Sequence, residues 1–248
     1  MALIEEFEKT GRWLFRWRSF LPFLILPFLL LALKDSEYFQ QIAESLPEKI
    51  WESFSLTISF LGLFIRCIVV GYAPKRTSGR NTKKQKAKTL NTTGMYSLLR
   101  HPLYLGNFII FLGILLFIAV WWFALISVMA FWLYYERIMF AEEDFLRKKF
   151  GNAFTEWAVK TSPFFPRFRN WQKPLLSFSL KNVLKREYTG FFLIISSFTF
   201  LDMAGDFIPE GKLGIDSGWL LFFIFGLIIY ITLRTLKKKT NILDVKER

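Results

Sequence analysis

The sequence predicts an all-α integral membrane protein with about six transmembrane helices, two of them joined in a tight hairpin. Three observations predict this class. Of the 248 residues, 53% are hydrophobic, and they gather in unbroken apolar blocks. Several blocks approach the ~20 residues that a membrane-crossing helix requires. The basic residues are concentrated in alternate connecting segments, as the positive-inside rule requires.

The first predicted span, Ser19 to Leu33, is short for a membrane helix. It is flanked by Arg16, Arg18 and Lys34, whose long side chains can reach the membrane surface. No small-residue cleavage site follows it, so we expect a span rather than a signal peptide.

The remaining apolar blocks predict five further spans. The second is Ser53 to Ala73, with Arg66 inside it, and the last two are Thr189 to Leu201 and Gly218 to Leu233. The block from Leu103 to Tyr135 has about 33 residues, too many for one span and too few for two spans with a long loop. We therefore expect a helical hairpin that turns near Trp121 and Trp122.

Charge placement predicts the orientation of these spans. Residues 1–18, 74–102, 136–188 and 234–248 together hold 29 of the 33 Lys and Arg residues. The connections at 34–52 and 202–217 hold only three and are acidic. This distribution predicts that both termini are cytoplasmic, in the inner membrane of a bacterium or the endoplasmic reticulum of a eukaryote.

The chain is predicted to form one membrane domain in three parts: residues 1–90 with a basic loop, a core at 91–166, and a two-span extension at 167–248. In the core, charged and apolar residues alternate over 136–160, which predicts that the fourth span continues into the cytoplasm as an amphipathic helix. Gly151 is expected to break this helix, and Pro163 and Pro166 to end any helix that follows.

Composition excludes several kinds of site. With a single cysteine, Cys67, and a single histidine, His101, the chain can build neither a disulfide framework nor a metal site that needs several such ligands. We attribute the net charge of +13 to the cytoplasmic face and its anionic lipids, not to nucleic acid. No protein partner is predicted.

The first candidate motif lies where the basic loop enters the third span, centred on Arg100-His101-Pro102-Leu103-Tyr104. Pro102 suits the first turn of a helix, where its missing N–H removes no hydrogen bond. Arg100 and His101 would then lie at a helix N-terminus that favours an anion. Taken alone, Arg-His-Pro more often has a structural role, with the arginine on a lipid phosphate and the histidine capping the turn.

The second candidate motif is Glu142-Glu143, a carboxylate pair that can hold an ammonium group or a ribose hydroxyl. Alone, the pair is more typical of a solvated helix face, with Glu143 paired to a basic residue one turn on. Because the two ends of a helical hairpin return to the same side of the membrane, we expect both motifs to face one cytoplasmic pocket.

In this combination the residues resemble the isoprenylcysteine carboxyl methyltransferase and phospholipid methyltransferase superfamily. The resemblance covers about a third of the chain, from Asn91 to Pro166. Its elements are Thr93-Gly94-Met95-Tyr96, Arg100 to Gly106, Glu142 to Gly151, and Pro163-Phe164-Phe165-Pro166.

The resemblance implies S-adenosylmethionine as the methyl donor and a membrane lipid as the substrate. The expected cofactor-binding residues are Leu90, Asn91, Tyr96, His101, Pro102, Leu103, Tyr104, Glu142 and Glu143, and the expected catalytic residues are Arg100 and Arg137. The cofactor's sulfonium and ammonium groups suit carboxylates, and its own carboxylate suits a basic helix N-terminus. No Gly-x-Gly-x-x-Gly motif of a soluble dinucleotide fold occurs.

One departure from the family pattern concerns the acceptor. A carboxyl methyltransferase is expected to have an arginine one helical turn before the first glutamate, where this chain has Ile138. Arg137, the nearest arginine, is offset by about 100° around a helix. This difference disfavours a farnesyl-cysteine substrate. The basic loop Lys75 to Lys88, with Arg66, Arg80 and Arg100, favours an anionic lipid head group, such as the lipid A phosphate that some bacterial relatives are thought to methylate.

The expected function is therefore methyl transfer to a phosphate or carboxylate oxygen of a lipid, which needs no strong base because the nucleophile is already charged. Three alternatives stay open: methylation of a prenylcysteine carboxylate or a phospholipid amine, an NADPH-dependent membrane reductase of the sterol type, and a non-catalytic lipid-binding protein. The sequence from Trp171 onward gives no indication of its chemistry.

Overall fold

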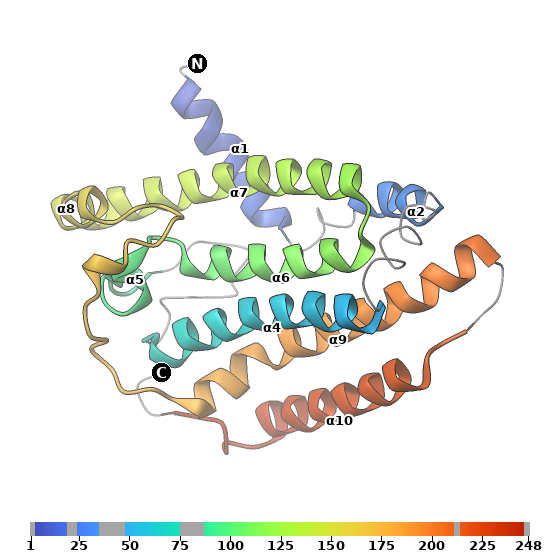
Figure 1. The fold of residues 1–248 in the computed structure, drawn as a ribbon. Coiled ribbons are helices and arrows are strands. Elements are labelled where there is room, and N and C mark those ends of the chain that lie inside the picture. Colours follow the sequence, from blue (N-terminus) through green and yellow to red (C-terminus); the bar gives the residue numbers. More distant parts are fainter. Residues whose placement is uncertain (1–2, 19–23, 35–47, 75–86, 211–213, 246–248) are drawn as a thin grey trace.

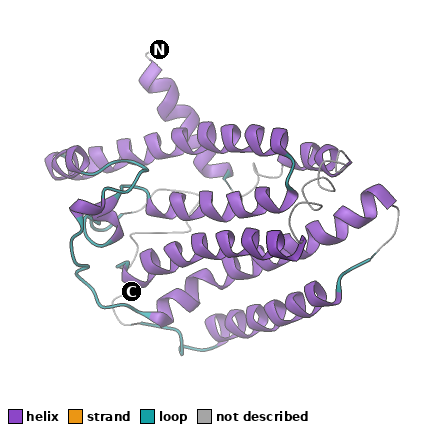
Figure 2. Cartoon of the chain, viewed as in Figure 1, coloured by secondary structure: helices purple, strands orange, loops and turns teal. Residues whose placement is uncertain are grey.

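The computed structural model describes residues 3–18, 24–34, 48–74, 87–210 and 214–245 (Figure 1). Within these ranges the regular elements are helices (Figure 2), and Leu99 and Ser162 form one isolated bridge. Four of the described helices are long and apolar enough to cross a membrane: α4 (Glu48–Tyr72), α7 (Trp121–Phe150), α9 (Leu180–Glu210) and α10 (Ser217–Lys239). A fifth, α6 (Pro102–Ile118), is apolar but shorter. The predicted all-α membrane fold is confirmed.

The shorter helices lie around the long ones. They are α1 (Leu3–Trp17), α2 (Leu26–Lys34), α5 (Met95–Leu98) and α8 (Asn152–Lys160), with a single 3-10 turn at Phe168–Asn170. The long helices form a row in the order α7, α6, α4, α9, α10, and each contacts the next (Figure 1). At one end of the row, on the left of Figure 1, the start of α6, the end of α7, the end of α4 and the start of α9 come together. Both sequence motifs lie at this end.

The predicted hairpin is present. Helix α6 ends at Ile118, Ala119 takes a left-handed conformation with φ of 54°, and α7 begins at Trp121. Helix α7 then continues without interruption to Phe150, so the predicted extension of the fourth span is confirmed. Gly151, with φ of 55°, separates α7 from α8 because its lack of a Cβ permits this backbone conformation.

Helices α4 and α6 pack closely because small residues meet between them. A Cβ added at Gly106 would lie 2.5 Å from Cγ of Arg66 and 2.9 Å from the backbone oxygen of Gly62. A Cβ at Gly113 would meet the Ser59 hydroxyl at 2.2 Å. Small residues at such contacts let the backbones of membrane helices approach each other. This close approach holds the start of α6, and with it the first motif, against α4.

The structure differs from the sequence-based expectation in two places. The fifth span is not confined to Thr189–Leu201, because α9 begins at Leu180 and runs to Glu210. Its charged first turns hid this length in the hydropathy pattern. The N-terminal residues form helix α1, which packs against α7, with Gly11 at the crossing point. The first predicted span is described only from Leu24 onward, and most of the basic loop, residues 75–86, lies outside the described residues.

Candidate active site

The first motif is held in place by the chain segment that follows α8. The Arg100 N–H donates to the Ser162 carbonyl over 2.8 Å, and the His101 N–H donates to the Pro163 carbonyl over 3.1 Å. Phe164, in the same segment, is buried beneath the motif with Tyr104 and Ile138. Pro102 occupies the first turn of α6, as predicted. The Pro-Phe-Phe-Pro ending therefore contributes to positioning the motif.

The two motifs meet in a group of five side chains between α6 and α7, here named the motif cluster: Arg100, His101, Tyr104, Glu142 and Glu143. Arg100 Nε donates to Glu143 Oε1 over 2.8 Å, and His101 Nε2 lies 3.0 Å from the same oxygen. Tyr104 Oη donates to Glu142 Oε1 over 2.7 Å. The hairpin thus brings together residues separated by about 40 positions in the sequence.

The Arg100 guanidinium donates hydrogen bonds to acceptors within the protein. Besides Glu143, its Nη1 donates to the carbonyl oxygens of Ala158 and Thr161, over 2.7 Å and 3.0 Å. These carbonyls lie at and just after the end of α8, so Arg100 ties the start of α6 to both α7 and α8. This arrangement favours a role in holding the site together.

Glu142 is the more accessible carboxylate of the motif cluster. Its side chain is 26% exposed, whereas the Glu143 side chain is 18% exposed. Its Oε2 lies 3.7 Å from His101 Nδ1, beyond the range of a strong hydrogen bond. Arg100 pairs with Glu143, whereas the Glu142 carboxylate accepts a hydrogen bond from the Tyr104 hydroxyl. A partly exposed carboxylate of this kind suits a cationic ligand.

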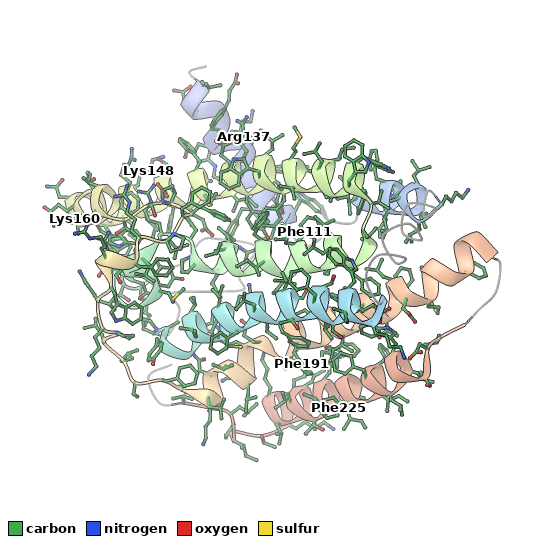
Figure 3. All side chains as sticks on the ribbon, viewed as in Figure 1. Phe111, Arg137, Lys148, Lys160, Phe191 and Phe225 are labelled. Carbon is green, nitrogen blue, oxygen red and sulfur yellow. The ribbon has the colours of Figure 1, made fainter. Side chains whose placement is uncertain are left out.

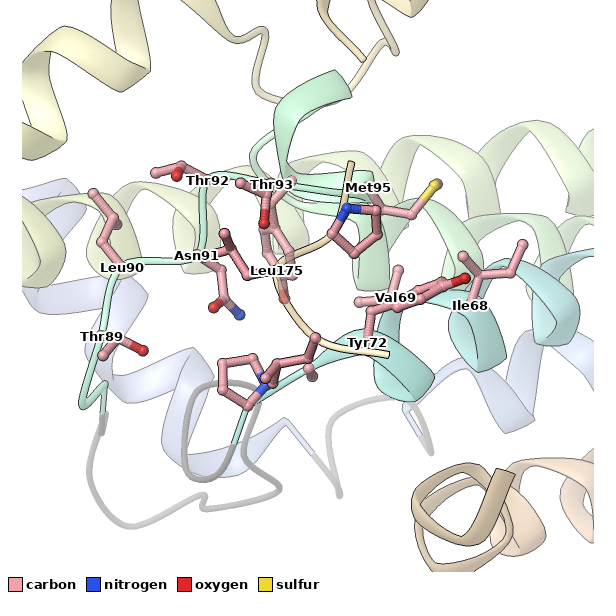
Figure 4. Close-up of a pocket in the computed structure, with 15 residues that line it drawn as sticks. Ile68, Val69, Tyr72, Thr89, Leu90, Asn91, Thr92, Thr93, Met95 and Leu175 are labelled. Carbon is pink, nitrogen blue, oxygen red and sulfur yellow. The ribbon is translucent and has the colours of Figure 1, made fainter. Parts of the chain in front are cut away.

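A cavity of about 250 Å³ lies between the end of α4, residues 89–93 and the start of α5 (Figure 4). Leu90, Asn91 and Tyr96 line it, together with the end of α4 and residues 174–176. Burial raises the pKa of the Tyr96 phenol, and the nearby Glu142 carboxylate adds to this effect, so the phenol stays protonated at neutral pH. Tyr96 belongs to α5, which lies just before Arg100 in the chain, so this short helix connects the cavity wall to the motif cluster.

The predicted site residues fall into three groups. Leu90, Asn91 and Tyr96 line the cavity. His101, Pro102, Tyr104, Glu142 and Glu143 lie in or beside the motif cluster, and Leu103 is partly exposed on the first turn of α6. Arg137 stands apart. Its guanidinium lies 3.4 Å from the ring centroid of Phe7 in α1, and it is labelled near α1 in Figure 3.

Ile138, at the position where carboxyl methyltransferases are expected to have an arginine, is fully buried beside Tyr104 and Met139. It therefore offers no charge to a substrate. Arg137 and Glu142 are five residues apart on α7, which places them about 140° apart around the helix. The catalytic role of Arg137 stays a prediction.

The structure contains a second cluster of polar side chains, which the sequence did not predict. Arg66 of α4, Asn107 of α6 and Glu187 of α9 form what we name the cross-helix cluster. Arg66 Nε and Nη2 donate to the two Glu187 oxygens over 2.9 Å and 3.0 Å, and Arg66 Nη1 donates to Asn107 Oδ1. The signal that could have found it is Arg66 itself, because a charge inside an apolar span requires a partner.

Comparisons with known proteins agree with the motifs. Residues 75–153 match the family described as phospholipid methyltransferase. The chain is 30% identical over 156 residues to the cobalt-zinc-cadmium resistance protein CzcN of Cupriavidus metallidurans, which is 60% of this chain and 69% of that protein. It is 34% identical over 112 residues to the nickel-cobalt-cadmium resistance protein NccN of Alcaligenes xylosoxydans xylosoxydans, or 45% and 50% of the two chains.

No solved structure matches the chain. The matched residues 75–153 contain both motifs and the hairpin that joins them. The chain belongs to the phospholipid methyltransferase family, within the superfamily of membrane methyltransferases that its motifs indicated.

Proposed function

We propose that this protein transfers a methyl group from S-adenosylmethionine to an anionic oxygen, phosphate or carboxylate, of a lipid head group. The observation that carries the proposal is the motif cluster, in which the Glu142 carboxylate is partly exposed and is held by a hydrogen bond from Tyr104. The cofactor carries an ammonium and a sulfonium group, and both cations suit such a cluster. The donor set therefore fits the cofactor.

Two sets of residues would hold the cofactor. Glu142, with Glu143 behind it, would attract the cationic groups. The cavity wall, with Ile68 and Val69 beside the Asn91 amide, combines apolar surface with a hydrogen-bonding group, as small-molecule sites generally do. When bound, S-adenosylmethionine supplies an electrophilic methyl carbon, whose bond to sulfur breaks with the electron pair kept on sulfur as the acceptor oxygen bonds to carbon.

The protein's own contribution is orientation. His101 lies between the two carboxylates and Tyr104 donates to Glu142, so the position of that carboxylate is fixed. An anionic acceptor is already nucleophilic and needs no general base. Holding two reactants in line can supply roughly 7–11 kcal/mol of the barrier. A site with a single histidine is sufficient for this kind of catalysis.

An anionic acceptor is supported by the eight Lys and Arg residues of the loop 74–102. Two of the arginines that the sequence assigned to the head group have other partners, because Arg66 pairs with Glu187 and Arg100 with Glu143. The support therefore comes from the seven other basic residues of the loop, Lys75, Arg76, Arg80, Lys83, Lys84, Lys86 and Lys88. An amine acceptor would prefer an acidic surrounding.

The names of the relatives give independent support for an anionic acceptor. Methylation of a phosphate or carboxylate oxygen removes a negative charge from the membrane surface, and a less negative surface attracts fewer divalent cations. Methylation of a phospholipid amine leaves its positive charge in place. Resistance to cobalt, zinc, nickel and cadmium, which the names of CzcN and NccN describe, is therefore more easily connected to an anionic acceptor.

Calorimetry on detergent-purified protein tests the cofactor. We expect micromolar binding of S-adenosylmethionine and none of NADPH. Glu142→Ala should weaken that binding at least tenfold, as expected for loss of a charged partner worth about 1.5–3 kcal/mol. The matched control is Glu156→Ala, an exposed glutamate on α8. Binding of NADPH alone would favour the reductase, and unchanged binding in Glu142→Ala would remove the motif cluster from the site.

A second assay identifies the acceptor. The protein is incubated with S-adenosylmethionine labelled on its methyl group and with vesicles that contain phosphatidate, phosphatidylglycerol, lipid A or phosphatidylethanolamine. We expect label in an anionic lipid. Label only in phosphatidylethanolamine would show an amine acceptor, and binding of the cofactor without transfer to any of these lipids would reopen the prenylcysteine and non-catalytic alternatives.

A further inference from the structure

We propose that Glu187 is a positioning residue that acts through Arg66 and Asn107 to turn the Tyr135 hydroxyl into a hydrogen-bond donor for the lipid acceptor oxygen. The inference rests on the proposed function, because it assigns a group to the acceptor side of that site. It also gives the C-terminal part of the chain a role, since Glu187 lies in α9, outside the residues 75–153 that match the family.

The first step is the ion pair between Arg66 and Glu187. The Arg66 side chain is 18% exposed and the Glu187 side chain 5% exposed. Two parallel hydrogen bonds of 2.9 Å and 3.0 Å join Nε and Nη2 of Arg66 to the carboxylate. A bidentate pair of this kind fixes the plane of the guanidinium as well as its position. Glu187 therefore decides where the remaining nitrogen, Nη1, points.

The second step is the orientation of the Asn107 amide. Arg66 Nη1 donates to Asn107 Oδ1, and a guanidinium has no acceptor atom, so the amide oxygen must face it. The amide nitrogen must then face the other way, where it donates to Tyr135 Oη over 3.1 Å. Without Arg66, either end of the amide could face the tyrosine, because the two ends differ little in shape.

The third step is the proton of Tyr135. Since Tyr135 Oη accepts from Asn107, its own O–H must donate elsewhere. In the part of the chain that the structure describes, the Tyr135 hydroxyl donates no hydrogen bond to a protein acceptor. The Tyr135 ring lies 4.7 Å, between centroids, from that of Tyr104, whose hydroxyl donates to Glu142. A directed donor therefore stands beside the motif cluster, which suits an anionic oxygen.

The competing explanation is that Glu187 only neutralises Arg66 inside the apolar part of the molecule. The double variant Arg66→Met with Glu187→Leu removes both charges of the ion pair and so distinguishes the two explanations. Replacing a buried ion pair by apolar residues of similar size is often neutral or stabilising. A purely structural role predicts that this variant regains both folding and methyl transfer. The positioning role predicts that it folds but keeps a low kcat, since Asn107 is no longer oriented.

The experiment compares Glu187→Gln, Tyr135→Phe and the combination of both, with Glu156→Gln as the control for loss of an exposed glutamate. We expect Tyr135→Phe to lower kcat/KM about ten- to a hundredfold, as for a hydrogen bond to a charged group. Glu187→Gln should lower it by a similar factor, and the combination should be no worse than Tyr135→Phe. S-adenosylmethionine binding should be unchanged in all of them. Independent, multiplying losses would overturn the proposal.

A spectroscopic measurement that needs no lipid substrate tests this inference separately from the proposed function. Tyr135 is replaced by 3-fluorotyrosine, and its fluorine resonance is recorded in the otherwise native protein, in Glu187→Gln and in Glu156→Gln. We expect a shift in Glu187→Gln only, because only that change alters the hydrogen bond at the ring hydroxyl. An unmoved resonance would disprove the relay even if methyl transfer is found, and a moved one would support it even if no lipid tested is methylated.

Discussion

The motif cluster and the cross-helix cluster both include a residue of α6, Tyr104 in the first and Asn107 in the second, yet they differ in how completely their charged groups are paired. In the motif cluster Arg100 pairs with Glu143, whereas Glu142 accepts a hydrogen bond from Tyr104 and is partly exposed. In the cross-helix cluster one arginine faces one glutamate through two parallel bonds, and both side chains are largely buried. The first cluster has capacity left for a ligand, and the second has none.

This difference teaches how to separate binding groups from positioning groups in a membrane protein. Both clusters contain ionisable residues close to the membrane, and such residues are functional candidates by default. Only an incompletely matched cluster can exchange its internal contacts for contacts with a ligand. A closed cluster acts on the ligand indirectly, by fixing the groups that it touches, as Arg66 does with Asn107.

Replacing one glutamate of each cluster by alanine tests most directly whether the two clusters differ, and we expect the largest effect here. Glu187→Ala leaves the Arg66 charge buried without its partner, and removing one member of a buried pair costs about 3–5 kcal/mol. Glu142→Ala removes a partly exposed acceptor of one tyrosine hydrogen bond, which is worth about 1 kcal/mol. Unfolding in mixed micelles, followed by circular dichroism, measures both.

If the two variants lose equal stability, the division into an open and a closed cluster is wrong. Adding Arg66→Met to the Glu187 variant is the control, since it removes the stranded charge and should restore most of the lost free energy of unfolding.

Much of the fold could be predicted because its signals are local. The apolar block from Leu103 to Tyr135 was too long for one span, and the structure turns at Ala119, two residues before the expected position. Gly151 ends α7 as predicted. The full length of α9 could not be read in the same way, because charged residues such as Lys185 and Glu187 lower its hydropathy without interrupting the helix.

The meeting of the two motifs in one cluster could also be predicted from the sequence, because it depends on the hairpin. The hairpin topology alone returns Glu143 to the level of His101. The pairing of Arg66 with Glu187 joins positions 121 residues apart, and no local pattern or turn predicts which acidic residue would face the arginine. Arg66 was predicted to bind an anionic lipid head group. The structure shows that its anionic partner is the Glu187 carboxylate. The contact of Arg137 with Phe7 was missed because the N-terminal residues were not expected to form a helix.

An uncharged substitution next to Arg66 tests whether close packing, and not charge alone, holds the cross-helix cluster in place. Gly106→Ala would place a methyl group 2.5 Å from Cγ of Arg66, so the arginine must shift from both Glu187 and Asn107. Overpacking of this kind typically costs about 1–3 kcal/mol. We expect a loss of stability in that range and a lower kcat, with unchanged S-adenosylmethionine binding. Gly205→Ala is the control, since no atom lies within 4 Å of its added methyl. Equal effects at Gly106 and Gly205 would show that the packing around Arg66 does not matter.

The smallest effect is expected where the charges are exposed. Lys148 of α7 lies 2.9 Å from Glu8 of α1 and 2.7 Å from Asp144, but its side chain is 62% exposed. Water and salt screen such pairs, so Lys148→Ala should leave the unfolding midpoint unchanged within error at neutral pH. The hydrogen bond from Lys148 holds the pKa of Glu8 below its usual range. Whatever the pair contributes is therefore present above the usual glutamate pKa and lost as the pH falls through the lowered value. A large loss of stability in Lys148→Ala at pH 7 would mean that burial is not what distinguishes the strong ion pair at Arg66 from the weak one at Lys148.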